Sequence, residues 1–399
     1  MQIKMIEHIK YYLFILPVIL VCSCSTTDRD DEPSPATGHI VPELYAASNM
    51  PLAAPGVDVD DNEGGDTGEE EEDDMIIKSF NESSILYFSQ LGTSSSPNFS
   101  DFTDTASPYC YRYQYNPNPA ATWDSGYNFK CLTSCQPFDW TLVPQLGSVG
   151  NAFSFFAMYF PGDNEVKWAV QTDQSDKENF IKSDIMGAYH ATSSLYTRLR
   201  FNLFHLMVYL RVTIYVPTFE SVDNSGNFNF SGFESDAVQG AYVLNANTGF
   251  NIDWLAVRSS DKMAPLTQST EPKANIKMFA HEATGDVETL KVSDFYAGGT
   301  LTQDQVRSYT FSVIFPSQNF GDNFLCFALK DEDNSLRYFY FSGSQILGDS
   351  GNYSLSQGTL QELFLYLPRN SNETILVGAN ILPWKDSVTD MTVTKDPAN

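Results

Sequence analysis

Short runs rich in Phe, Tyr and Val, separated by turn-forming residues, fill the sequence from about residue 84 to its end. Aromatic and β-branched residues favour half-buried strands, and Gly, Pro, Asn and Asp clusters mark the turns between them. Close spacing of such runs is typical of antiparallel β-sandwiches. We therefore expect an all-β fold with one short helical turn at 176–181. The expected strands are 84–91, 109–115, 152–160, 199–216, 308–315, 323–329, 337–341 and 362–367.

The chain is long enough for two domains after its N-terminal region, since domains commonly hold about 100–200 residues. Residues 218–232 are rich in Ser, Asn and Gly and contain few large apolar side chains. Such a stretch favours a connection between domains. We expect an N-terminal β-sandwich domain at 77–217 and a C-terminal one at 218–399.

The first residues have the pattern of an export signal. Lys4 and Lys10 precede an apolar run at 11–21, which is too short to cross a bilayer as a helix, because a crossing needs about 20 residues. The run ends in Val21-Cys22-Ser23-Cys24, which is similar to the lipobox of bacterial lipoproteins. We expect 1–23 to be a lipoprotein signal peptide and Cys24 to carry the acyl anchor in the outer membrane.

Negative charge is concentrated after the signal. The formal net charge of the chain is −27, and residues 28–74 hold sixteen acidic residues and one basic residue, Arg29. A chain of this composition buries too little apolar surface to fold, so 24–76 is interpreted as a disordered acidic tether. Only the patch at 39–45 has the composition of a strand. The acidic balance also repels phosphate backbones and excludes nucleic acid as a partner.

Cysteine usage leaves the disulfide pattern open. Cys110, Cys131, Cys135 and Cys326 remain after the signal, and an exported chain can oxidise them. Bridges between Cys131 and Cys135 or between Cys110 and Cys131 are candidates, and four reduced thiols are an equal alternative. A zinc site is excluded, because neither paired CxxC motifs nor suitably spaced His residues accompany them.

No motif of catalysis is complete. The GDSG at 348–351 lacks the next Gly of a protease nucleophile loop, and HE at 281–282 lacks the second His of HExxH. Residues 58–69 match four ligand positions of an EF-hand loop without its turn Gly. We interpret the three as a turn, a chance pair and solvated tether. We therefore expect no enzyme, no metal and no cofactor.

Four tyrosines alternate at positions 109, 111, 113 and 115. A single strand would place them on one face, because side chains alternate across a strand. Such a face could stack on sugar rings as an aromatic platform. The commoner alternative is a half-buried face packed against a second sheet.

Several segments together resemble the fimbrillin family, the subunits of type V pili in Gram-negative anaerobes. FSFFAMYFP at 153–161 resembles the family's FYAYYP strand, and KSDIMGA at 182–188 with LRFNLFHLMVYL at 199–210 resembles its next conserved region. The stretch 374–384, which ends in Trp384, is similar to the closing strand pattern. The resemblance spans about 78–399.

This resemblance implies two tandem transthyretin-like β-sandwich domains and a fimbrial subunit that contributes to cell adhesion. In the family, a trypsin-like protease removes an N-terminal strand, and the groove that opens accepts a strand from a neighbouring subunit. The partners would be other fimbrial subunits, the outer membrane through the lipid, and a host or glycan ligand. The alternative is a surface lipoprotein that binds glycans without polymerising.

Proteolytic maturation has few candidate cleavage sites before the first domain, because no Lys or Arg occurs from 30 to 77. A protease specific for basic residues would cut at Arg29 or Lys78, and we expect Lys78. The incoming strand would be 387–395, in which Ser387, Thr389, Met391 and Val393 alternate. Thr105 and Ser387 lie in DTA and DSV sequences that resemble an O-glycosylation signal of exported proteins in such anaerobes.

Overall fold

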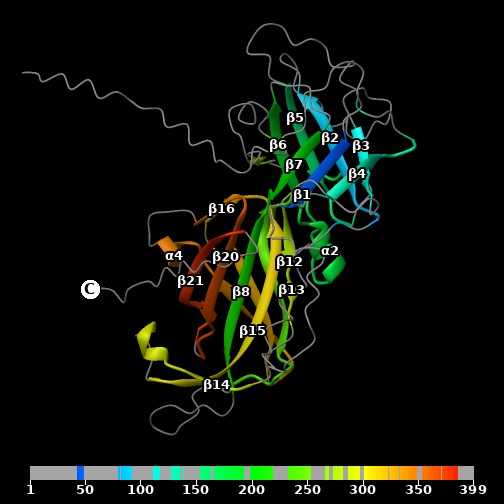
Figure 1. Ribbon diagram of the computed structural model, residues 1–399. Helices are drawn as coiled ribbons and strands as arrows, with labels where there is room; N and C mark the ends of the chain where they lie inside the picture. Colours follow the sequence, from blue (N-terminus) through cyan, green and yellow to red (C-terminus); the bar gives the residue numbers. More distant parts are fainter. Residues whose placement is uncertain are drawn as a thin grey trace, which may run out of the picture. The chain divides into compact units, whose positions relative to one another are not determined.

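Strands dominate the computed structural model of the protein (Figure 1). It describes residues 43–48, 80, 82–91, 111–116, 127–134, 138, 153–162, 166–192, 198–218, 232–252, 266–268, 273–281, 286–296, 301–321, 323–331, 333–347, 353–369 and 371–384. All of these belong to one compact unit, Pro35–Asn399. Among them the helices are short, α2 (Lys177–Lys182), α4 (Ser344–Leu347) and the 3₁₀ turn η4 (Val292–Asp294). The predicted all-β fold is confirmed.

The first seven strands form a sheet that closes on itself in the order β1-β4-β3-β2-β5-β6-β7. β1 is parallel to β7, and the other neighbouring pairs in this closed sheet are antiparallel. The strands are β1 (Glu43–Ser48), β2 (Ile85–Leu91), β3 (Tyr111–Tyr115), β4 (Tyr127–Cys131), β5 (Phe153–Tyr159), β6 (Met186–Thr192) and β7 (Arg198–His205).

Aromatic rings fill the closed sheet. The Phe88 ring stacks on Tyr111 at 4.9 Å between centroids, and Phe138 meets Tyr111 edge-on at 5.2 Å. The Tyr113 hydroxyl accepts a hydrogen bond from the backbone N–H of Phe138 at 2.9 Å. Burying rings of this size contributes strongly to stability, provided that each phenol finds a partner. The predicted alternative of a packed tyrosine face is therefore the right one for Tyr111 and Tyr113, whereas Tyr109 lies outside the described residues.

The segment at 166–185 connects β5 to β6 within the closed sheet and contacts the sandwich through Gln174. The Asp176 carboxylate accepts a hydrogen bond from the Asn179 backbone N–H at 2.8 Å, and so caps α2 where the sequence predicts a helical turn. Gln174 is buried, and its side-chain amide pairs with the backbone of Ile314 in both directions, at 2.7 and 2.9 Å. This pairing satisfies polar groups that burial would otherwise leave unbonded.

The C-terminal half is a sandwich of two sheets. Its six-stranded sheet has the order β13-β15-β8-β20-β21, with β14 added on β15, and its four-stranded sheet has the order β12-β9-β17-β18. Figure 1 shows β8, β15 and β20 side by side as one layer. The first sheet contains β8 (Val208–Pro217), β13 (Phe279–Ala280), β14 (Glu288–Leu290), β15 (Asp304–Phe315), β20 (Thr359–Tyr366) and β21 (Ile375–Pro383). The second contains β9 (Val238–Asn247), β12 (Lys273–Lys277), β17 (Leu325–Lys330) and β18 (Leu336–Phe341).

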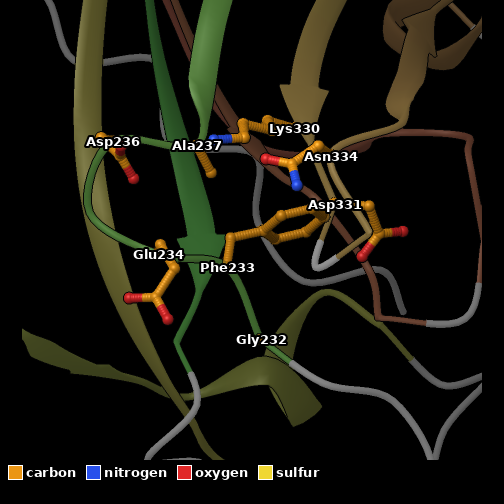
Figure 2. Close-up of a pocket in the computed structure, with 8 residues that line it drawn as sticks. All are labelled: Gly232, Phe233, Glu234, Asp236, Ala237, Lys330, Asp331 and Asn334. Carbon is orange, nitrogen blue, oxygen red and sulfur yellow. The ribbon is translucent and has the colours of Figure 1, made fainter.

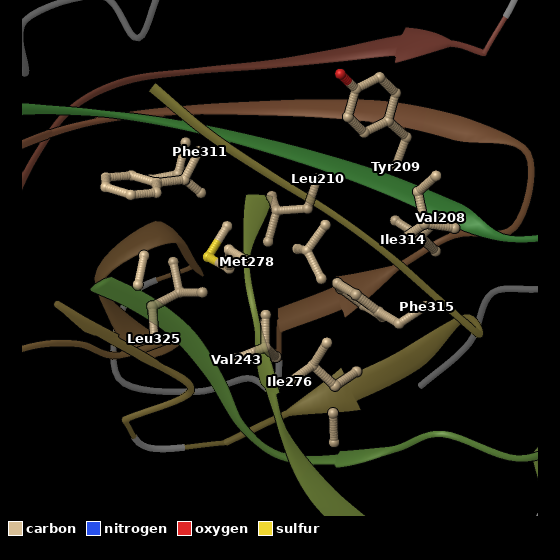
Figure 3. Close-up of a cluster of buried hydrophobic side chains, with 14 of the residues drawn as sticks. Val208, Tyr209, Leu210, Val243, Ile276, Met278, Phe311, Ile314, Phe315 and Leu325 are labelled. Carbon is tan, nitrogen blue, oxygen red and sulfur yellow. The ribbon is translucent and has the colours of Figure 1, made fainter. Parts of the chain in front are cut away.

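Two small antiparallel pairs complete the fold. They are β10 (Phe250–Ile252) with β11 (Leu266–Gln268), and β16 (Gln318–Phe320) with β19 (Tyr353–Leu355). The core lies between the two larger sheets (Figure 3), where Leu210 and Phe311 of one sheet meet Val243 and Leu325 of the other. These four side chains are at most 3% exposed, so the apolar face of each sheet is covered.

The chain passes from the closed sheet to the sandwich between His205 and Val208. The predicted strand at 199–216 is therefore two strands, β7 and β8, broken at Leu206-Met207. β8 pairs with β15 and β20 of the sandwich, although the predicted boundary at 217–218 assigns it to the N-terminal domain. The division into domains at that boundary stays a prediction.

A buried charged network connects the end of β8, the start of β15 and the end of β20. Arg369 donates to both carboxylate oxygens of Asp304, from Nε at 3.1 Å and from Nη2 at 2.9 Å. The Tyr366 hydroxyl donates to the same carboxylate at 2.7 Å, and Arg369 Nη2 also reaches the backbone oxygen of Thr218 at 2.6 Å. Burial beside Asp304 raises the pKa of Tyr366 far above its ordinary value of 10.0.

Candidate functional site: a strand slot in the closed sheet

β1 occupies a slot between β4 and β7, which we call the strand slot. It pairs with β7 over six residues, from Glu43 opposite Arg198 to Ser48 opposite Leu203, and with β4 over three. The other neighbour of β7, β6, pairs with it only at His205 and Phe204. In the described part of the chain, β1 therefore supplies the ladder partner for the first six residues of β7.

The edges of the strand slot adjoin the aromatic core. The register places Ala46 opposite Phe201 and Leu44 opposite Phe129. The rings of Phe201 and Phe129 are at most 2% exposed, and Phe201 lies 5.7 Å from Phe88. If β1 left, two backbone edges beside buried rings would open, and this is the kind of surface that accepts an extended strand.

The candidate cleavage residues flank β1 in the sequence. Arg29 precedes Glu43–Ser48 and Lys78 follows it, with no Lys or Arg from 30 to 77. A cut after Arg29 would leave β1 attached to the fold, whereas a cut after Lys78 would separate β1 from every later strand. Both residues lie outside the described residues. Their roles stay predictions.

The far end of β7 is held by a buried polar cluster. His205 Nδ1 lies 2.7 Å from the Asp184 carboxylate, and both side chains are only 4% exposed. The Trp384 ring stacks on His205 at 4.0 Å between centroids, with an interplanar angle of 8°. His205 Nε2 and Trp384 Nε1 are both buried without a hydrogen-bond partner. β7, which borders the strand slot, is thus held at its end by Trp384, the residue that precedes the C-terminal segment 385–399.

Most other predicted site residues lie outside the described residues. These are Cys24, Thr105, Ser387, Cys110 and Cys135, together with the motifs at 58–69 and 348–351. The lipid, glycosylation and disulfide assignments stay predictions.

Two of the predicted cysteines are described. Cys131 ends β4 and is partly exposed, with its Sγ 3.4 Å from the backbone oxygen of Leu132. Cys326 is a buried free thiol in β17, and burial raises its pKa. Cys326 therefore carries no bridge, and the predicted bridges among Cys110, Cys131 and Cys135 do not involve it.

His281 follows β13, and its Nε2 lies 2.7 Å from the Ser312 hydroxyl. No group of three or more His, Cys, Asp or Glu side chains in the described ranges is arranged to hold a metal ion. Among the same residues, no helix is long and apolar enough to cross a membrane.

An acidic cavity of about 380 Å³ lies at the turn after β17 (Figure 2). The Phe233 ring extends toward Asp331 and Asn334, while Glu234 points away from it. Burial lowers the pKa of the Arg337 guanidinium, and the nearby charge of Asp331 partly offsets this effect. We interpret Glu234, Asp236 and Asp331 as solvated surface carboxylates, with Lys330 as a neighbouring cation in the same lining.

Comparison with known proteins finds no matching family model and no matching curated protein. Solved structures that resemble the chain are fimbrial and cell adhesion proteins. A proposed cell adhesion protein from Bacteroides uniformis matches with a TM-score of 0.45 at 10% identity, over 88% of this chain and 100% of that one. The tip fimbrial protein Mfa3 from Porphyromonas gingivalis, truncated at its C-terminus, matches with 0.32 at 9%, over 76% and 95%.

The fimbrial anchor protein Mfa2 from the same organism matches with a TM-score of 0.34 at 10% identity, over 86% of this chain and 97% of that one. These scores are low, and none of the three likenesses decides how this chain folds or acts.

Proposed function

We propose that this chain is a structural or accessory subunit of a surface fimbria, joined to its neighbours by strand exchange at the strand slot. The observation that carries the proposal is the place of β1. It is the first strand among the described residues, it alone among described strands covers residues 198–203 of β7, and it lies between the two basic residues Arg29 and Lys78.

Strand exchange would follow from this arrangement in two steps. Cutting after Lys78 makes β1 a separate peptide, whose described contacts with the fold are its ladders with β4 and β7. A strand from a second subunit that pairs with the same edges can then displace it, because backbone hydrogen bonds depend little on sequence while the buried rings select apolar side chains. Growth of this kind is head-to-tail and does not close, so it yields a fibre.

The donor in this proposal is the segment 387–395 of the next subunit. It begins three residues after Trp384, whose ring is held against His205 at the end of β7. A fixed attachment point at Trp384 sets where the donor segment begins and raises its effective concentration near a neighbouring subunit. A subunit that keeps β1 and the acyl group on Cys24 would instead remain at the outer membrane as a base or accessory subunit.

The proposal assigns the chain a non-enzymatic role at the cell surface, with other fimbrial subunits as partners. Gel electrophoresis of surface material tests it, since strand-exchanged polymers resist detergent until they are heated. We expect a ladder of multimers in the unheated wild-type sample and a single band after heating. Lys78→Gln should lose the ladder, and Arg29→Gln should keep it. A ladder that is missing in the wild type, or that survives in Lys78→Gln, would refute the proposal.

A further inference from the structure

Most border strands of the sandwich have covered or short edges, which keeps them from pairing with other chains. β18 is bonded by the loop beside it, since the Tyr340 N–H donates to the Asn372 oxygen at 2.8 Å and the Thr374 N–H donates to the Tyr340 oxygen at 2.9 Å. β12 is bonded at its end, where the Lys277 N–H donates to the Thr172 oxygen at 2.9 Å. β13 and β14 are only two and three residues long.

β21 differs from the other described border strands. It ends the six-stranded sheet and pairs with β20 alone along its nine residues (Figure 1). Its sequence, ILVGANILP, carries no charge, and the Ile381 side chain is 54% exposed. The register with β20 shifts near Val377, and Pro383 has no N–H, so the regular part of this edge is 378–382. A long edge without charges is a surface on which another strand can pair.

The pairing of β20 decides which backbone groups of β21 point outward. The Leu367 N–H donates to a backbone oxygen of β8 at 3.1 Å. Backbone groups of successive residues in a strand point to opposite sides, so the odd-numbered residues of β20 bond to β8 and the even-numbered ones bond to β21. Asn380 lies opposite Glu362, and its backbone therefore points to β20. The N–H and C=O groups of Ala379 and Ile381 point the other way, where no strand or loop of the described chain bonds to them.

The side chains of this edge fit a second copy of the same strand. Ile381 lies opposite Gln361 and Ala379 opposite Leu363, so both are on the side of β21 that faces the sandwich interior. In an antiparallel pair of two β21 strands with Asn380 on the two-fold axis, Ala379 of each copy exchanges both N–H···O bonds with Ile381 of the other. Each exposed Ile381 then lies beside a small Ala379 on the same face, and no charge opposes the contact.

We propose that two copies of this chain associate edge to edge through β21, so that their six-stranded sheets become one continuous sheet. The contact uses the same strand on both copies and therefore closes at a dimer. It requires neither the loss of β1 nor the segment 387–395, so it goes beyond the proposed function. Between subunits that are already polymerised, it would join two fibres side by side.

Sedimentation velocity of the full mature chain tests this association. The chain carries Cys24→Ser, so that no lipid causes aggregation, and is left uncut at Lys78, so that β1 stays in the strand slot. We expect a concentration-dependent shift from monomer to dimer and no larger species. A chain that ends at Lys385 should dimerise equally, which separates pairing of β21 from binding of a neighbour's segment 387–395.

Two matched substitutions locate the contact. Ile381→Lys places a charge on the open edge and should raise the dissociation constant of the dimer about tenfold or more. Leu336→Lys is the control, because Leu336 is 50% exposed on β18, whose edge is already bonded. This variant should dimerise like the wild type. Both changes are on exposed side chains, so both variants should unfold at the wild-type temperature.

Cysteine cross-linking tests the register. Asn380→Cys would place two cysteines in a non-hydrogen-bonded pair with Cα atoms about 4.5 Å apart, which a disulfide can span. In Ile381→Cys the two cysteines are diagonal neighbours about 7–8 Å apart, which is beyond the usual reach of a disulfide. Non-reducing gels should show a covalent dimer for Asn380→Cys above the background that the wild-type cysteines set, and none for Ile381→Cys.

Four results would overturn the proposal. These are a monomer at every concentration, loss of the dimer in the chain that ends at Lys385, equal dimerisation of Ile381→Lys and Leu336→Lys, and equal cross-linking of the two cysteine variants.

Discussion

Replacing Asp304 by Ala should be among the most destabilising single changes in the C-terminal sandwich. The Asp304 side chain is fully buried and Arg369 is 10% exposed, with a shortest separation of 2.9 Å. Removing the carboxylate leaves a buried guanidinium without its counter-ion and the Tyr366 hydroxyl without its acceptor. Breaking a buried pair from one side costs about 3–5 kcal/mol.

Urea unfolding followed by tryptophan fluorescence measures this cost. With an m-value of about 3 kcal/mol/M, the midpoint of Asp304→Ala should fall by about 1 M or more. The control is Lys291→Ala, which breaks a pair of similar length, 2.7 Å, whose side chains are 65% and 58% exposed. Exposed pairs contribute about 0–1 kcal/mol, so this midpoint should hardly move.

A double replacement, Asp304→Leu with Arg369→Met, separates burial of charge from loss of packing. It should be more stable than Asp304→Ala, because no unpaired charge then remains in the interior. The reasoning fails if Asp304→Ala is no less stable than Lys291→Ala, or if the double variant is the least stable of the set.

Three further predictions follow from other parts of the chain. Trp384→Ala should cost about 3–5 kcal/mol in thermal unfolding, while Trp384→Phe, which keeps a ring on His205 and drops the unpaired N–H, should stay within about 1.5 kcal/mol of wild type; equal losses would contradict the stacking argument. Burial raises the pKa of Tyr353 and Tyr366 above 10.0, so the folded state keeps protons that the unfolded chain loses, and stability should be full below pH 10 and fall as the pH rises above it. Tyr353→Phe should show a shallower fall in alkaline urea titrations, and an identical slope would count against this cause. A radioactive fatty acid should label the wild type and not Cys24→Ala, and label on the variant would overturn the lipid assignment.

Local features of the fold were predictable because their signals are local. The runs at 84–91, 152–160 and 308–315 contain strands because apolar, β-branched and aromatic residues cluster between turn residues. Asp176 predicts the start of α2, because its side chain can cap the first turn of a helix. The break between β7 and β8 has no such signal, since Leu206 and Met207 are both apolar and fully buried, so the sequence there continues as one apolar run.

Which strands pair over long sequence distances could not be predicted, because the available sequence signals are local. β1 lies parallel to β7, about 155 residues later, and β8 lies parallel to β20, about 150 residues later. A strand's sequence records which of its faces is buried and not which strand it will meet. β1 (Glu43–Ser48) shares only residues 43–45 with the strand-like patch at 39–45, and it lies within the stretch 24–76 whose composition predicts a disordered tether. Its pairing with β4 and β7 was not predictable, because the acidic residues around it hide a short strand that is stabilised by distant partners.

The most direct test of strand exchange at the slot is the N-terminal sequence and mass of subunits taken from assembled surface fibres. If β1 is released so that a neighbour's strand can enter between β4 and β7, the polymerised subunits begin at Ser79. Polymerised subunits that all retain acylated Cys24, and with it an intact Glu43–Ser48, would contradict the account.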